Sequence, residues 1–264
     1  MNEPLGGIRP QDHLVQFYGE ETGLVENVAH YLREGAERGD SMIVVATPAH
    51  TKLFTAQLDR SGVRVGDLKR DGRLLLLDAE RTLSTFLVDG EPDWNRFNEK
   101  VGNVIRSAKP RDGALRAYGE MVDLLWKEGR LGAATRLEGF WNRLLESERF
   151  GLYCAYTVDL LNPDAPTSAL QEIISTHSHL LPVCTDRELE TAVGRAMDDV
   201  LGSPAVAALL PLIRADVVAP AALPETERKV LWLRKNLPRQ ANDVLSRARA
   251  YYEEEYAQAG RCGT

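Results

Sequence analysis

The feature that most constrains the fold is a repeated alternation of short apolar runs with amphipathic helical segments. The runs predicted as strands are residues 13–18 (HLVQFY), 40–46 (DSMIVVA), 74–78 (LLLLD), 115–119 (LRAYG) and 150–157 (FGLYCAYT). Periodic patterns between and after them predict helices over residues 24–35, 50–61, 82–87, 94–109, 121–127, 136–146 and 168–177. Strands that alternate with crossover helices predict an α/β domain whose doubly wound, mainly parallel sheet is covered on both faces.

The pattern changes after Cys184, where the strand runs stop. We therefore predict an α/β domain over residues 1–185 and a C-terminal helical extension over residues 186–264. In this tail, helices are expected over residues 186–201, 204–214 and 225–256, with the proline-containing stretch 217–224 before the last one. We interpret the tail as a surface that packs on the parent domain or on a second copy in a homodimer, rather than as an effector.

Composition narrows the classes of partner. The formal net charge is −7, from 39 acidic and 32 basic residues, and no basic stripe is long enough to hold a phosphate backbone. Direct nucleic-acid binding is therefore not expected. Membrane insertion is not expected either, because no apolar run approaches the length needed to span a bilayer. Three widely spaced cysteines favour neither a disulfide framework nor a metal knuckle, so a reducing cytoplasm is the expected compartment.

The first strand-to-helix loop, YGEETGLVEN at residues 18–27, opposes tight binding of ATP in the manner of a P-loop. A phosphate-binding P-loop requires GxxxxGK[ST], because backbone N–H groups cradle the phosphates and the lysine neutralises charge. This loop has no lysine, and Glu20, Glu21 and Glu26 would repel a triphosphate. With no GxSxG nucleophile elbow either, we predict a protein that is not an enzyme and predict no cofactor.

Two groups of residues are candidates for a binding site. Glu120 follows a predicted buried strand, where a carboxylate is costly unless it is paired or contacts a ligand, and Met121 is next to it. Glu120 could equally cap the following helix. The second group is His177 and His179 with Cys154 and Tyr156, whose side chains suit a metal, a haem or a polar organic ligand if His13 folds close to them. The alternative is a set of satisfied polar residues around an inert buried Cys154.

Several motifs together resemble the MEDS family, the methanogen/methylotroph DcmR sensory domain. The motifs are HLVQFY at 13–18, GDSMIVVATPAH at 39–50, RAYGEMVDLLW at 116–126, LEGFWN at 137–142, LYCAYT at 152–157 and THSHLLP at 176–182. The resemblance implies a prokaryotic sensory input domain for small organic compounds, with a fold similar to KaiC/RecA-type ATPases. It implies ligand contacts at His13, Tyr18, Glu120, Met121, Cys154, Tyr156, His177 and His179.

The leading hypothesis is a ligand-sensing signal-transduction module. A small organic molecule would bind at the carboxyl ends of the strands, contact Glu120 and the histidines, and shift the helical tail. Relatives are often joined to kinases or DNA-binding modules, and because this tail shows neither, we expect a signalling partner protein such as a kinase or transcriptional regulator. The alternatives are a divergent nucleotide hydrolase with Glu120 as base, a metal or haem sensor using His13, Cys154, His177 and His179, and a scaffold without a ligand.

Overall fold

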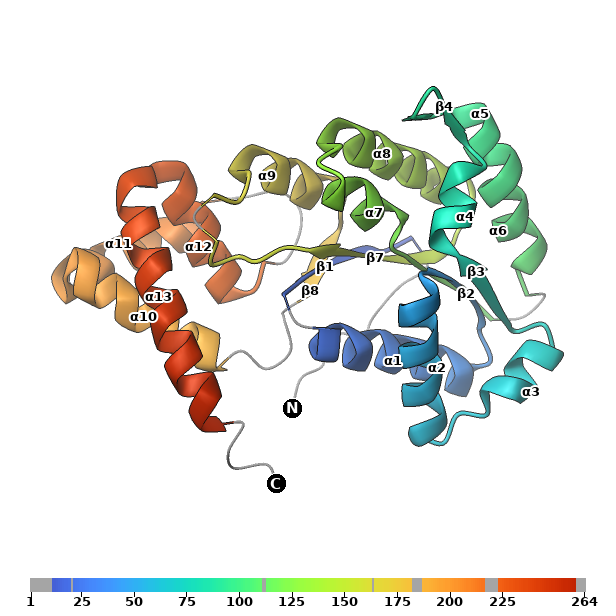
Figure 1. Cartoon of the computed structure of the whole chain (residues 1–264), viewed down its shortest axis with the longest axis horizontal. Helices are drawn as coiled ribbons and strands as arrows, with labels where there is room; N and C mark the ends of the chain where they lie inside the picture. The colour runs from blue at the N-terminus through green and yellow to red at the C-terminus, as the bar shows by residue number, and fades with distance from the viewer. Residues whose placement is uncertain are drawn as a thin grey trace.

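The computed structural model of the chain describes residues 11–19, 21–110, 113–162, 164–181, 187–216 and 223–259, with the backbone alone for residues 255–259. Within these ranges six parallel strands form one sheet in the order β3-β2-β6-β7-β1-β8 (Figure 1). The strands are β1 (His13–Tyr18), β2 (Ser41–Ala46), β3 (Leu74–Asp78), β6 (Leu115–Gly119), β7 (Gly151–Thr157) and β8 (His179–Leu181). The predicted doubly wound, parallel α/β class is confirmed.

Two layers of helices cover the sheet, one on each face (Figure 1). The layer drawn below the sheet contains α1 (Glu21–Arg38), α2 (Pro48–Arg60) and α3 (Val65–Arg70). The layer drawn above it contains α4 (Ala79–Ser84), α5 (Trp94–Phe97), the π-helical turn η1 (Asn98–Gly102), α6 (Asn103–Ala108), α7 (Met121–Lys127), α8 (Leu131–Ser147) and α9 (Thr167–Thr176). Alternate side chains of the strands enter two apolar cores, so Tyr153 packs with α1 while Cys154 faces α8.

The five predicted strands are all present and end within one residue of their predicted bounds. Sequence patterns missed β8, which is only three residues long and acquires its identity by pairing with β1. They also missed α3 and the short hairpin of β4 (Leu87–Val88) and β5 (Glu91–Pro92). The helix predicted over residues 82–87 begins earlier, because the Asp78 carboxylate accepts a hydrogen bond from the Arg81 backbone N–H at 2.8 Å and caps α4.

The tail contains α10 (Arg187–Leu201), α11 (Ser203–Ala215), α12 (Glu225–Asn236) and α13 (Pro238–Ala259), which pack beside α9 and the β8 side of the sheet (Figure 1). The single helix predicted over residues 225–256 is wrong. It breaks at Leu237, since Pro238 has no N–H and drives the preceding residue out of the helical conformation. The predicted boundary near residue 185 and Cys184 lie outside the described residues.

The tail shares its apolar core with the α/β part of the chain. Leu223 and Leu231 of the tail belong to the same buried cluster as Leu170 of α9, whereas Leu161 belongs to the tail's own cluster. The two parts are thus joined by side-chain packing as well as by the chain. No helix in the described part of the chain combines the length and the apolar character needed to cross a membrane.

Candidate functional site

The first candidate site lies where β6 ends and is centred on Glu120, which is 2% exposed. Its carboxylate accepts hydrogen bonds from the Thr47 backbone N–H and from the Tyr118 hydroxyl at 3.2 Å, and it pairs with His50 Nδ1 at 2.5 Å. Thr47 and His50 follow β2, the neighbour of β6. Neighbouring parallel strands end at the same edge, and α2 and α7 leave that edge on opposite faces of the sheet. Such an edge is where open α/β sheets bind ligands.

The Glu120–His50 pair is a buried ion pair. Burial opposes ionisation of Glu120, but the hydrogen bonds from His50 and Thr47 outweigh it and lower the pKa of the carboxyl. The hydrogen bond to Glu120 raises the pKa of His50 against the opposing effect of burial. On its open side His50 Nε2 lies 3.6 Å from Glu21, whose side chain is 66% exposed. An ionised, fully paired Glu120 is a poor general base.

A second carboxylate, Asp123, connects three elements at the same edge. It accepts hydrogen bonds from the Tyr18 hydroxyl at 3.1 Å and from the Thr157 backbone N–H at 2.6 Å, and pairs with Lys127 at 2.8 Å. Burial and the charge of Asp123 raise the pKa of Tyr18, so this hydroxyl stays protonated. The ends of β1 and β7 are therefore fixed to α7 by one buried charge.

The second candidate site is a buried quartet formed by His13, Glu138, Cys154 and His177, each at most 3% exposed. His13 Nε2 lies 3.3 Å from Glu138 Oε2 and 3.4 Å from Cys154 Sγ. His177 Nε2 lies 3.4 Å from Glu138 Oε1, and one potential ligand atom from each of the four residues lies within 4.8 Å of the others. The residues come from β1, α8, β7 and the segment after α9.

Hydrogen bonds outside the quartet fix both imidazole rings. Asn142 donates its amide N–H to the Thr176 carbonyl at 2.9 Å, which turns its oxygen toward His13 Nδ1 at 2.8 Å. His177 Nδ1 lies 2.6 Å from the Ile173 carbonyl, an acceptor. Both rings consequently carry their proton on Nδ1 when neutral and direct Nε2 toward Glu138. The Tyr156 hydroxyl donates to Glu138 Oε1 at 2.5 Å and orients the carboxylate.

The Asn142–His13–Cys154 order resembles the arrangement of thiol hydrolases, but its electrostatics oppose that chemistry. A nucleophilic cysteine needs a lowered pKa and access to substrate. Burial, followed by the charge of Glu138, raises the pKa of Cys154 well above its ordinary value, and the side chain has no exposed surface. Burial and the neighbouring His177 lower the pKa of His13, although Glu138 opposes this.

The predicted site residues separate into these two sites. Tyr18 and Glu120 lie at the carboxyl edge, whereas His13, Cys154, Tyr156 and His177 lie in or beside the quartet. Met121 packs in the core and His179 is exposed on β8, with its Nδ1 2.9 Å from the Ser178 hydroxyl. The structure therefore places Glu120 and the predicted histidines in separate sites and does not gather them around one ligand position.

Sequence reasoning missed His50, Asp123, Glu138 and Asn142. Glu138 had a detectable signal, because it lies between Leu137 and Trp141 on the helix face that is otherwise apolar. Asp123 likewise falls within the buried first turn of α7. The roles of His50 and Asn142 depend on contacts with residues 70 and 129 positions away, which one sequence does not display.

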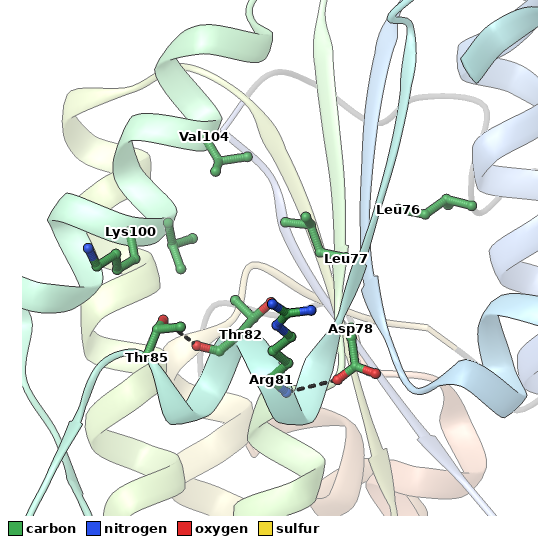
Figure 2. Close-up of a pocket in the computed structure, with 9 residues that line it drawn as sticks. Leu76, Leu77, Asp78, Arg81, Thr82, Thr85, Lys100 and Val104 are labelled. Carbon is green, nitrogen blue, oxygen red and sulfur yellow. Dashed lines mark hydrogen bonds between the residues drawn. The ribbon is translucent and has the colours of Figure 1, made fainter. Parts of the chain in front are cut away.

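A cavity of about 380 Å³ lies next to the carboxyl end of β3 (Figure 2). Leu77 and Val104 provide apolar walls, while Arg81, Thr82 and Lys100 provide polar ones, and the Arg81 side chain extends into the space between them. Neither candidate site contributes to its lining. It is a separate concavity on the edge of the domain.

Fold and sites together define a parallel α/β domain with two buried polar centres, whose first strand-to-helix loop lacks the GxxxxGK[ST] sequence of a phosphate-binding loop. The comparison with protein families matches residues 12–178 to the MEDS family, described as the methanogen/methylotroph, DcmR sensory domain. The match spans more than half of the chain, which therefore belongs to this family of sensory domains. No curated protein matches the chain.

Proposed function

We propose that the chain is an input module that binds a small organic molecule at the carboxyl edge of the sheet and signals through its helical tail. One observation carries the proposal: the segment after β7, described over residues 158–162 and 164–165, is bonded to the carboxyl edge at its start and to the tail at four of its residues. Asp123 holds Thr157, and the Val158 N–H donates to the Tyr18 carbonyl at 3.0 Å. The segment thus begins at the candidate site.

The tail holds the same segment through two arginines. Arg234 of α12 donates hydrogen bonds to the carbonyls of Leu160 at 2.9 Å and Asn162 at 2.5 Å, and to a third at Ala165. Arg249 of α13 pairs with Asp159. Because all of these acceptors belong to one short segment, a displacement at Thr157 changes the contacts of both tail helices.

The edge offers suitable chemistry for a small polar molecule. Glu21 and Lys127 form its solvent-facing rim, with side chains 66% and 49% exposed, over buried His50 and Asp123. A hydroxyl or amino group could exchange with one of these partners without leaving a buried charge unpaired. A ligand that binds one tail arrangement better than the other by a few kcal/mol shifts the population, as allosteric coupling requires.

The proposed output is non-catalytic and passes to a separate partner protein. Glu120 is saturated by His50, Tyr118 and Thr47, which disfavours the alternative of a nucleotide hydrolase using this carboxylate as base. The absence of magnesium-dependent ATP or GTP turnover in the purified chain would support the binding role. Turnover that disappeared in Glu120→Gln would contradict it.

The proposed coupling from Asp123 through the segment after β7 to the helical tail is tested by amide hydrogen exchange in Asp123→Asn. We expect faster exchange in residues 158–162, 164 and 165 and in α12, because the carboxamide replaces one of the two acceptor oxygens that receive Thr157 and Tyr18 with an N–H donor and removes the charge paired with Lys127. The matched control is Asp67→Asn, since Asp67 is a surface carboxylate on α3 paired with Arg64 and Arg70. If the exchange rates of α12 were the same in Asp123→Asn as in the wild type, this coupling would be refuted.

Ligand binding itself is tested by thermal unfolding in the presence of short alcohols and amines, with methanol, methylamine and ethanolamine as the first probes. A ligand that binds only the folded state raises the unfolding temperature with its concentration. We expect at least one probe to do so in the wild type and in Asp67→Asn but not in Glu120→Gln. An equal shift in all three proteins would place binding elsewhere.

A further inference from the structure

We propose that His13, Glu138, Cys154 and His177 form a four-coordinate site for a divalent transition-metal ion, with Zn²⁺ as the reference ion. The inference rests on the quartet alone and does not depend on the carboxyl-edge proposal. Its ligand set differs from the sequence-based expectation in replacing the exposed His179 with Glu138.

Three of the distances within the quartet are close to the edges of a coordination tetrahedron. Zn²⁺ binds imidazole nitrogen and carboxylate oxygen at about 2.0–2.2 Å and thiolate sulfur at about 2.3 Å, which gives ligand-to-ligand edges of about 3.3 Å for N–O and about 3.6 Å for edges with sulfur. His13 Nε2 lies 3.3 Å from Oε2 of Glu138, whereas His177 Nε2 lies 3.4 Å from the other carboxylate oxygen, Oε1. The His13–Cys154 and Glu138–Cys154 distances are 3.4 and 3.8 Å. His13 Nε2, Cys154 Sγ and Glu138 Oε2 therefore have the spacing of one face of a tetrahedron, and with His177 one ligand atom from each of the four residues lies within 4.8 Å of the others.

The rings are also prepared as ligands by the groups behind them. Metal-binding histidines commonly donate their second N–H to a carbonyl or carboxylate, which fixes the tautomer. Asn142 fulfils this role for His13, and the Ile173 carbonyl fulfils it for His177. Tyr156 adds the hydrogen bond that a ligating carboxylate normally receives.

The quartet contains more acceptors than donors. With both protons on Nδ1, the two Nε2 atoms and the two oxygens of Glu138 all present lone pairs, while Tyr156 and Cys154 supply one proton each. His177 Nε2 is buried and makes no hydrogen bond to any described residue, although it faces Glu138. Buried polar atoms without a partner are costly, so a cation at this point satisfies what the side chains do not.

Charge balance favours a dication. A thiolate from Cys154 and the carboxylate of Glu138 carry two negative charges, the histidines are neutral, and a divalent ion makes the site neutral in a region that is fully buried. Binding would displace the Cys154 proton, since thiolate is the ligand form. Mixed N, S and O ligands suit Zn²⁺ or Co²⁺ and disfavour Mg²⁺ and Ca²⁺, which prefer all-oxygen sites.

The test uses the full-length chain produced with Zn²⁺ in the medium, desalted, and analysed for bound metal. We expect one Zn²⁺ per chain in the wild type and at least tenfold less in Cys154→Ser and Glu138→Gln. The matched control is the double variant Cys184→Ser/Cys262→Ser, which keeps Cys154 as the sole cysteine and should retain the metal. Asn142→Ala should weaken affinity about 10- to 100-fold, as loss of a supporting contact does.

X-ray absorption of the wild-type Zn²⁺ protein keeps the inference testable if a variant fails to fold. We expect one sulfur neighbour at about 2.3 Å and three nitrogen or oxygen neighbours at about 2.0–2.2 Å. The Co²⁺ form should show tetrahedral visible absorption and a thiolate charge-transfer band that the double cysteine variant retains. A wild-type protein that holds no stoichiometric metal, or a bound ion without a sulfur neighbour, would overturn the proposal.

Discussion

Arg234→Met should separate the tail from the segment that it holds. The arginine is 7% exposed and donates hydrogen bonds to three backbone carbonyls. The hydrogen bond to Leu160 is buried, and the other two are part-buried. Burial lowers the pKa of Arg234 against the opposing charge of Asp159, but a guanidinium remains protonated. Methionine keeps the apolar volume of the stem and removes the donors.

The magnitude follows from these three bonds. A hydrogen bond to a charged group contributes about 1.5–3 kcal/mol to the free energy of unfolding. When the donor is removed and the carbonyl stays buried without a partner, the protein loses this whole contribution. Water can replace the donor at the two part-buried carbonyls of Asn162 and Ala165. We therefore expect the free energy of unfolding to fall by about 3 kcal/mol, which is dominated by the Leu160 bond.

Urea denaturation measures the loss, and native-state hydrogen exchange locates it. The amides of Leu161 and Ala165 should exchange roughly 100-fold faster, since each 1.4 kcal/mol is a factor of ten. The control is Arg239→Met on the exposed side of α13, for which we expect a change within about 0.5 kcal/mol. If Arg234→Met lost no more stability than this control, the tail would not be anchored through residues 158–165.

Two further predictions concern buried groups of the α/β domain. The lowered pKa of Glu120 and the raised pKa of His50 mean that their pair stabilises the fold fully between the ordinary values of 4.5 and 6.5. The stability is lost as pH falls through the folded pKa of Glu120 and as it rises through that of His50. The difference in unfolding free energy between wild type and Glu120→Gln should therefore shrink from pH 6 to pH 8.5 in urea titrations; a constant difference would contradict the ion pair. Trp141→Ala should cost about 3–5 kcal/mol, because Trp141 is 1% exposed and packs edge-on against Phe97 at 5.0 Å between ring centroids; a midpoint shift equivalent to less than about 1 kcal/mol would show that the core collapses around the cavity.

Most strands and helices of the α/β domain were predictable because each has a hydrophobic pattern that can be read within its own segment of sequence. Apolar β-branched runs such as residues 41–46 form strands wherever both faces are covered, and helical periodicity marks the segments that cover them. Some predictions failed because a local signal was overlooked, such as Pro238, which divides the predicted last helix in two. Others failed because the deciding contact is distant in sequence, such as the pairing of β8 with β1. The Asp78 cap that advances α4 belongs to the first kind.

The candidate sites were less predictable, because they depend on which strands become neighbours. The sequence alone determined the family resemblance, the parallel α/β class and the residue types available for binding. The tertiary structure decided that Glu120 meets His50 at one edge, and that His13 meets Cys154, 141 positions away, beside Glu138 and His177. Strand order is set by the packing of helices on both faces, so it brings together residues whose spacing along the chain carries no record of their contact.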